Sequence, residues 1–217
     1  MIYGAKKDLQ LNKVGAKVMF AYNGTDHFGG LQLNKVGGKA YNLARLSLND
    51  FNVPTFFILD TDIFWDFLGE ERKAYKELLV NYERKALPEI RKIIKNKDFS
   101  PELKDLISTK LREVFDDNEK IAIRSSATDE DGVDCSFAGM MESYLNVDIN
   151  EDVFAYIKKC YLSCFSDRAM EYRVLHGLIN DELAMAVIIQ SMVEADFSVV
   201  VFTTNPQTNN PDETLIS

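Results

Sequence analysis

The chain has 217 residues, of which 46% are hydrophobic, 27% are charged and five are prolines. This composition is typical of a folded protein and excludes an intrinsically disordered one, and the length fits one large domain or two small ones. Lys and Arg number 25 and Asp and Glu number 34, so the net charge of −9 argues against a protein that coats nucleic acid or an anionic membrane.

The sequence also argues against export or insertion into a membrane. The first ten residues, MIYGAKKDLQ, lack the apolar core of a signal peptide. Ala184–Ile189 is among the longest apolar runs, and its six residues fall far short of the ~20 that a membrane span needs. We therefore expect a cytoplasmic protein with no membrane partner.

The cysteines point to a reducing compartment, because their number, three, is odd. Cys160 and Cys164 are four residues apart, which places them on one face of a helix. A metal site needs about four donors, and no motif spacing joins these two to Cys135, His27 or His176. We expect buried structural thiols, with a metal or redox role as the alternative.

The N-terminal sequence contains one segment twice, as LQLNKVGAK at 9–17 and as LQLNKVGGK at 31–39. Two copies do not make a solenoid, which needs at least three. The first copy leads into a short predicted strand, VMFAY (18–22). Only the second copy combines a glycine-rich turn, a lysine and a following helical pattern, so we assign 1–30 to an N-terminal extension.

A strand and several helices are predicted next. In chain order they are a strand over Val53–Leu59, a helix over Thr61–Leu68 capped by Asp60 or Thr61, and a charge-rich helical region over Glu70–Phe115 broken at Pro88 and at Lys95–Asp98. Ser100 as N-cap and Pro101 at the first helical position mark the start of its last helix.

A second block of structure begins near residue 121. We expect a strand over Ile121–Ile123, a polar loop over 124–142, a strand over 144–147 and a long helix capped by Asn150, with an apolar face formed by Val153, Phe154, Ile157, Cys160, Tyr161, Cys164 and Phe165.

Two adjacent strands, rich in Val and Ile, are predicted next, over Ala184–Val193 and Val199–Phe202, joined by a turn around Glu194–Phe197. The last residues, TLIS, look like the beginning of a strand, which suggests that the chain is a fragment of a longer protein.

Two segments have the chemistry of phosphate binding. Paired glycines, Gly37 and Gly38, let backbone N–H groups approach an anion, and Lys39 adds an ammonium at a helix start. Arg124 follows an apolar strand, where its guanidinium suits bidentate contact with phosphate oxygens. Taken alone, the glycine segment is also compatible with a plain helix-entry turn. The acidic cluster 129–131 fits helix capping or a metal, so the metal ligands stay unknown.

Five segments in order resemble the N-terminal ATP-binding domain of the phosphoenolpyruvate synthase and pyruvate phosphate dikinase family: GGKAYNL (37–43), RSSATDEDGVDCSFAGMMESYLNV (124–147), CFSDRAMEYR (164–173), IIQSMV (188–193) and VFTTNP (201–206). The resemblance covers roughly 31–217. It implies an α+β, ATP-grasp-like nucleotide-binding domain, incomplete at its C-terminus. We divide the chain into the extension 1–30, a first lobe 31–118 with a helical insert, and a second, truncated lobe 119–217.

The resemblance also implies roles for individual residues. Lys39 and Arg124 match phosphate-contacting, catalytic positions. The other implied ATP-binding positions are the glycines Gly37 and Gly38, the loop residues Ser136, Gly139, Met140, Met141, Glu142 and Ser143 that close over the phosphates, and the hinge residues Gln190, Met192 and Val193 that hold adenine. Arg168 and Arg173 either face the cleft or brace a helix.

The implied function is binding of ATP with Mg²⁺ for phosphoryl transfer to a histidine on a carrier domain, with a phosphoenolpyruvate/pyruvate domain elsewhere in the full protein. The isolated chain is then expected to be inactive. Two alternatives stay open: the ATP domain of a rifamycin-type antibiotic phosphotransferase, and a truncated, non-catalytic nucleotide-binding module.

Overall fold

The computed structural model describes residues 18–21, 31–49, 51–80, 82–129, 131–132, 135–136, 139–180 and 182–217, and for 18–21, 131–132 and 135–136 it describes the backbone. The repeat copy at 9–17 and the extension 1–30, apart from strand 18–21, lie outside the described residues. The first half contains β1 (Val18–Ala21), α1 (Leu33–Leu48), β2 (Phe56–Leu59), α2 (Thr61–Leu68), η1 (Gly69–Glu71), α3 (Arg72–Val80), η2 (Arg84–Ala86), α4 (Leu87–Asn96) and α5 (Pro101–Val114). The second half contains β3 (Lys120–Ala127), β4 (Asp131–Gly132), β5 (Cys135–Ser136), β6 (Ser143–Asp148), α6 (Val153–Ser163), α7 (Asp167–His176), β7 (Met185–Ser191), β8 (Val201–Phe202) and β9 (Leu215–Ile216).

A five-stranded sheet in the order β1-β2-β7-β3-β6 organises the fold, and every neighbouring pair in it is antiparallel. Helices and an antiparallel sheet in one chain confirm the α+β class. β7 lies at the centre, between a strand from the predicted first lobe (31–118) and one from the second (119–217). The two predicted lobes, divided at residue 118, therefore share a single sheet.

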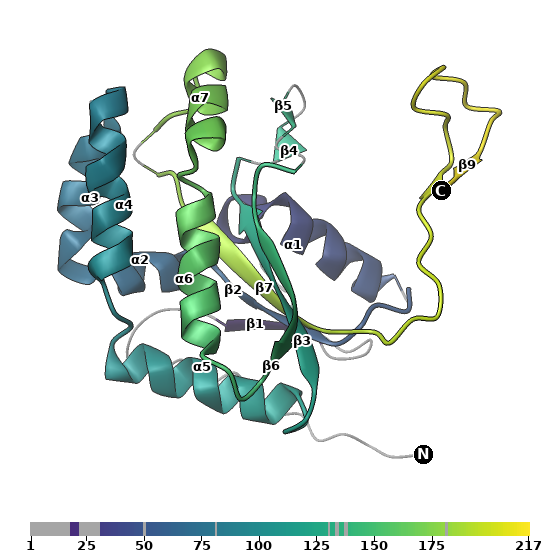
Figure 1. Ribbon diagram of the computed structural model, residues 1–217, viewed down its shortest axis with the longest axis horizontal. Coiled ribbons are helices and arrows are strands. Elements are labelled where there is room, and N and C mark those ends of the chain that lie inside the picture. The colour runs from purple at the N-terminus through teal and green to yellow at the C-terminus, as the bar shows by residue number, and fades with distance from the viewer. Residues whose placement is uncertain are drawn as a thin grey trace.

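Helices cover both faces of this sheet (Figure 1). Side chains alternate between the faces along each strand. On one face, which we call the α1 face, Val36, Ala40 and Ala44 of α1 pack on Phe56, Ile58, Ala186 and Ile188. On the other face, Phe57, Leu59, Ile121, Ile123, Val187 and Ile189 join the larger core with the remaining helices. Figure 1 shows α1 to the right of the sheet and α2, α3, α4 and α6 to its left.

The local helix signals of the sequence are mostly confirmed. Asp60 caps α2, since its carboxylate accepts hydrogen bonds from the backbone N–H groups of Asp62 and Ile63. Ser100 caps α5 with Pro101 as its first residue. The break predicted at Pro88 falls just before it: α3 ends at Val80, η2 follows, and Pro88 lies in the first turn of α4, where a proline costs no helical hydrogen bond.

The predicted cap of α6 is wrong. Asp152, not Asn150, accepts a hydrogen bond of 3.2 Å from the backbone N–H of Ala155. The Asn150 amide instead donates to the carbonyl of Asp117 at 2.8 Å and to Asp148 at 3.0 Å. The helix behind the cap has the expected buried face, and Cys160 and Cys164 are buried thiols within it or at its end.

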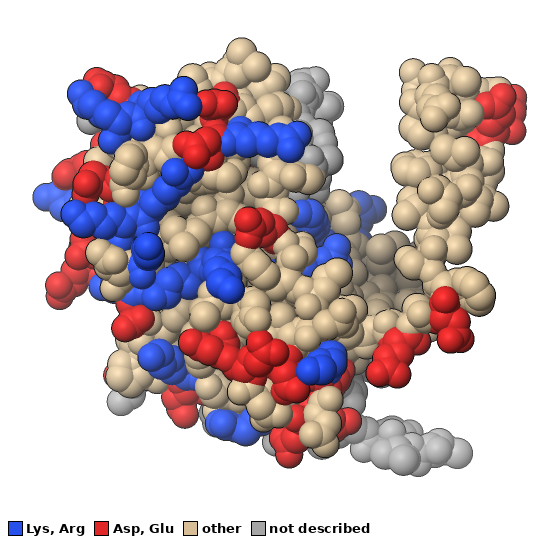
Figure 2. Space-filling view, in the orientation of Figure 1, with Lys and Arg blue, Asp and Glu red and all other residues tan. Residues whose placement is uncertain are grey.

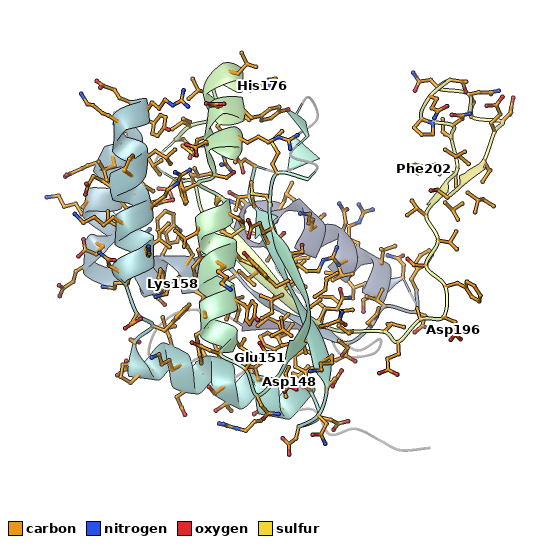
Figure 3. The ribbon with its side chains drawn as sticks, in the orientation of Figure 1. Asp148, Glu151, Lys158, His176, Asp196 and Phe202 are labelled. Atoms are coloured by element: carbon orange, nitrogen blue, oxygen red, sulfur yellow. The ribbon has the colours of Figure 1, made fainter. Side chains whose placement is uncertain are left out.

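The C-terminal strands differ from the predicted pairing. β8 pairs with β9 and not with β7, because both edges of β7 are already occupied by β2 and β3. Residues 193–217, the C-terminal arm, therefore leave the main sheet, as Figure 1 shows, and Figure 2 shows mostly uncharged side chains on the arm. Phe202, labelled on the arm in Figure 3, is 41% exposed. Within the described part of the chain, no helix is both long enough and apolar enough to span a membrane.

Candidate functional site

The glycine pair lies inside α1, at a kink. Gly37 has φ 72° and ψ 165°, a conformation far outside the helical region, and helical residues lie on both sides of it. The prediction of a glycine turn before the helix is thus corrected, since a helical turn formed by Leu33–Val36 precedes the glycines. The kink gives the segment from Gly38 onward a helix start of its own.

Close packing against β3 explains why residue 37 is a glycine. A Cβ atom there would lie 2.5 Å from the carbonyl oxygens of Ser126 and Ala127 and 2.6 Å from Ser126 Oγ. Ser126 Oγ donates to the carbonyl of Val36 at 2.7 Å and accepts from the N–H of Ala40 at 3.1 Å. One hydroxyl therefore bonds to both sides of the kink and holds it against the strand.

Lys39 reaches the same strand one residue earlier. Its Nζ donates to the carbonyl of Ser125 at 3.5 Å, and the side chain is half-buried. Arg124, also half-buried, directly precedes Ser125 in β3. The structure thus brings the two cations named from sequence to neighbouring positions on β3, although one comes from α1 and the other from the strand itself.

The Arg124 side chain is held from the neighbouring strand β7. Its Nη1 donates to Gln190 Oε1 at 3.1 Å, and Gln190 Nε2 donates to the carbonyl of Pro54 at 3.4 Å. Gln190 is 6% exposed. This chain of hydrogen bonds links three segments that are far apart in the sequence: the segment that leads into β2, strand β7 and strand β3.

The segment expected to close over phosphates is hydrogen-bonded to β3 near the end of that segment, at Glu142. Ser125 Oγ donates to the carbonyl of Glu142 at 2.9 Å, and the Glu142 carboxylate bonds the hydroxyl of Tyr144. Gly139 has a positive φ of 70° and is exposed. Met141 is buried at 8% exposure, whereas Met140 is half-buried and Ser143 is exposed. Ser136 lies in β5, and its side chain is outside the described residues.

Lys39 and Glu142 both bond to Ser125 of β3 and both act on the buried thiol of Cys160. Burial raises the pKa of the Cys160 thiol to about 12; Glu142 contributes to the rise and Lys39 opposes it. Both charges therefore lie within electrostatic range of one buried sulfur. The link from Glu142 to Ser125 and from Ser125 to Lys39 places both on the same part of β3.

Of the predicted hinge residues, Gln190 lies within β7, and Met192 and Val193 follow the strand. The backbone N–H of Met192 donates to the carbonyl of Lys120 at 2.9 Å, which continues the strand pairing by one residue. Val193 is 60% exposed and begins the C-terminal arm. The predicted adenine segment is thus partly paired backbone and partly open chain.

Of the two arginines of the 164–173 segment, one is structural and one is on the surface. Arg173 is fully buried and donates to both carboxylate oxygens of Asp129, at 2.6 and 3.1 Å, and to the carbonyl of Cys164 at 2.5 Å. Arg168 is exposed. Since Asp129 lies two residues after the end of β3, Arg173 braces the start of the polar loop against α7.

Sequence reasoning did not predict the hydrogen-bond partners of Ser125, Ser126 or Pro54. The two serines stood in a recognised motif, but their hydroxyls bond to backbone groups of distant segments. The Pro54 contribution is a main-chain carbonyl, which carries no residue-type signal. Among the side chains that the structure describes, no three His, Cys, Asp or Glu groups gather as a metal ion would require.

The labelled charges in Figure 3 belong to other parts of the molecule. Asp148 ends β6, Glu151 lies between β6 and α6, Lys158 lies on α6, and His176 ends α7. In Figure 2 acidic and basic side chains are mixed over this face. The candidate site is therefore defined by α1, β3 and β7 and not by these surface charges.

Comparison with known proteins gives a family match and several relatives. Residues 33–217 match the family described as pyruvate phosphate dikinase, AMP/ATP-binding domain. The chain is 37% identical over 183 residues to a probable phosphoenolpyruvate synthase of Archaeoglobus fulgidus, covering 79% of the chain and 24% of that relative. It is 36% identical over 189 residues to a rifampicin phosphotransferase of Bacillus cereus, covering 82% and 22%. It is 33% identical over 204 residues to a probable phosphoenolpyruvate synthase of Methanocaldococcus jannaschii, covering 88% and 17%. The chain thus spans 17 to 24% of the length of these three curated relatives.

Proposed function

Because the chain belongs to the pyruvate phosphate dikinase AMP/ATP-binding domain family, we propose that it binds ATP beside α1, with the phosphates at Lys39 and Arg124. The observation that carries the proposal is the convergence of these two cations on β3 from segments distant in sequence. A net charge of −9 repels a polyanion, so local positive charge is required where ATP binds.

Each part of the site has a chemical task in this proposal. The backbone N–H groups at the helix start after Gly37 favour an anion, and Lys39 adds a mobile positive charge. The planar guanidinium of Arg124 suits two phosphate oxygens at once. Phosphoryl transfer depends mainly on positioning and on neutralising the charge of the transferred group. Lys39 and Arg124 would supply that charge.

The segments flanking the cations complete the proposed site. Residues 136–143 would cover the phosphates, anchored where Ser125 bonds Glu142, and Met192 and Val193 would lie against adenine. We extend this to an ATP-grasp-like arrangement, in which the nucleotide lies between this sheet and a second part of the protein that includes the C-terminal arm.

We also propose that magnesium accompanies the nucleotide. The ion would neutralise phosphate charge, and phosphate oxygens and water are ligands that it prefers. The described side chains form no acidic, histidine or cysteine cluster for a metal. We therefore assign no protein ligand to Mg²⁺ and derive no step through the ion.

The acceptor of the phosphoryl group is a proposal about the whole protein. Relatives named as probable phosphoenolpyruvate synthases favour transfer to a histidine on a carrier domain, and from there to pyruvate in a further domain. A relative named rifampicin phosphotransferase is 36% identical against 37% for the first synthase, which keeps an antibiotic acceptor as the second candidate. In either case the 217-residue chain would bind nucleotide without completing the reaction.

Isothermal titration of the chain with ATP and Mg²⁺ tests the proposal. Lys39→Ala and Arg124→Ala are each expected to weaken binding about 10- to 100-fold, the effect of losing one charge-assisted hydrogen bond. Arg45→Ala is the matched control, because it removes one positive charge from the exposed last turn of α1. The proposal fails if the wild-type chain binds no ATP, or if Arg45→Ala weakens binding as much as the two site variants do.

A further inference from the structure

We infer that Gln190 is a positioning residue that orients the Arg124 guanidinium toward phosphate, in place of the adenine contact that the family resemblance implies for it. The inference rests on the proposed function, since it requires that Arg124 meets the phosphates of ATP. It assigns to the hydrogen-bonded chain Arg124–Gln190–Pro54 a specific task in nucleotide recognition.

The strand register puts the two side chains on the same face of the sheet. Gln190 lies opposite Ala122, and Arg124 lies opposite Ile188, in the antiparallel pair of β3 and β7. Gln190 and Arg124 are therefore diagonal neighbours, a spacing that long side chains can bridge. Ile188 belongs to the α1 face, so both polar side chains lie on the face covered by α1, the helix that carries Lys39.

The chemistry of the partners sets the orientation of the Gln190 amide. A guanidinium can only donate hydrogen bonds, so the amide oxygen must face Arg124. A proline carbonyl can only accept, so the amide nitrogen must face Pro54. In the opposite orientation, the amide N–H groups would face the N–H groups of Arg124, and the amide oxygen would face the carbonyl oxygen of Pro54. The observed contacts of 3.1 and 3.4 Å match the single orientation that satisfies both partners.

Burial makes Gln190 better suited to support a neighbour than to recognise a base. It is 6% exposed, and the facing residue on its other neighbouring strand, β2, is Phe56. Arg124 is half-buried and donates one of its five N–H groups to Gln190. A long arginine side chain loses conformational freedom when it binds a ligand, and an arginine already fixed by a buried amide loses less.

A double-mutant cycle read with two ligands tests the inference on the 217-residue chain. Binding of ATP with Mg²⁺, and separately of adenosine, is measured by displacement of a fluorescent ATP analogue for wild type, Gln190→Leu, Arg124→Ala and the double variant. Gln190→Leu is expected to weaken ATP binding about 3- to 10-fold, the cost of ordering one free side chain, and to leave adenosine binding unchanged. In the Arg124→Ala background the same substitution is expected to have no effect on ATP, because its target is gone.

Gln190→Glu gives a second route to the same result. It keeps an oxygen facing Arg124 but adds a negative charge, which pairs with the guanidinium and repels phosphate. We expect more than tenfold weaker ATP binding with unchanged adenosine binding, and folding of each variant is checked by thermal unfolding. Equal losses for ATP and adenosine in either variant, or additive effects in the cycle, would overturn the inference. If the wild type binds no ATP, the proposed function itself fails; if Arg124→Ala weakens ATP binding while Gln190 variants affect both ligands alike, only the positioning role fails.

Discussion

Gly37 offers the sharpest test of how the proposed phosphate-binding turn is built. Its φ of 72° and ψ of 165° fall in a region that only glycine populates readily. A Cβ atom would also lie 2.5 Å from two backbone carbonyl oxygens of β3, well inside van der Waals contact. Gly37→Ala therefore combines backbone strain with a clash against groups that cannot rotate away.

The size of the effect follows from these two contributions. Forcing a non-glycine residue into such a conformation costs about 1–3 kcal/mol. Inserting a methyl group into a closely packed position costs about 1–3 kcal/mol more. We expect Gly37→Ala to lower the free energy of unfolding by about 2–6 kcal/mol, a large part of the ~5–15 kcal/mol that stabilises a typical domain.

Gly177→Ala is the matched control, because it separates strain from clash. Gly177 has φ 63° and ψ 31°, and an added Cβ meets nothing within 4 Å. Its substitution should cost only the ~1–2 kcal/mol of the left-handed conformation. Urea unfolding followed by circular dichroism measures both variants. If the two lose the same stability to within about 0.5 kcal/mol, the reasoning about close packing at Gly37 is refuted.

Three further predictions concern buried polar groups. Arg173→Met should lower the free energy of unfolding by about 3–5 kcal/mol, because it leaves the largely buried carboxylate of Asp129 unpaired. Arg168→Met, at an exposed position, should change the free energy of unfolding by less than about 0.5 kcal/mol. Burial, reinforced by the neighbouring carboxylate of Asp62, raises the pKa of Asp60 from 3.8 to about 6. Between about pH 4 and 6 the folded protein therefore binds a proton that the unfolded chain has released, and the stabilisation that this proton gives is lost as the pH rises. Asp60→Asn keeps the helix cap without titrating, so wild type should lose about 3 kcal/mol relative to it from pH 4 to pH 7, measured by urea unfolding. Cys160 and Cys164 are both 0% exposed and should stay unmodified by iodoacetamide in the native protein and react in urea, as read by mass spectrometry.

Each of these predictions has a clear contrary outcome. Equal stability losses at the two arginines would contradict the bracing role of the buried one. A stability difference between wild type and Asp60→Asn that is constant with pH would contradict the raised pKa. Alkylation of either buried cysteine at the rate of the unfolded chain would show that the core around α6 opens readily.

Local signals in the sequence predict helices here better than they predict strand pairing. The helix at Thr61–Leu68 was predicted correctly, because its cap and its apolar residues lie within a few positions of each other. The predicted pairing of Ala184–Val193 with Val199–Phe202 is wrong, because the partners of β7 begin at Phe56 and Lys120. No residue near β7 indicates which distant strands will flank it.

The same limit applies to the candidate site. The residue types of Lys39 and Arg124 match phosphate chemistry, so a motif names them. Lys39 bonds to the backbone carbonyl of Ser125, and Arg124 bonds to the Gln190 amide, which in turn bonds to the backbone carbonyl of Pro54. These contacts depend on how strands and helix come together in space. Which residues hold the cations in place was therefore not predictable from the sequence.

The central position of β7 has a consequence for how the protein folds during synthesis. β2 ends at Leu59 and β3 ends at Ala127, yet the strand that joins them begins only at Met185. Until the ribosome has added those later residues, both earlier strands present unpaired edges, which are prone to associate with other chains. The order of strands thus delays assembly of the sheet until nearly nine-tenths of this sequence has been made, with its long-range pairings forming last and slowly.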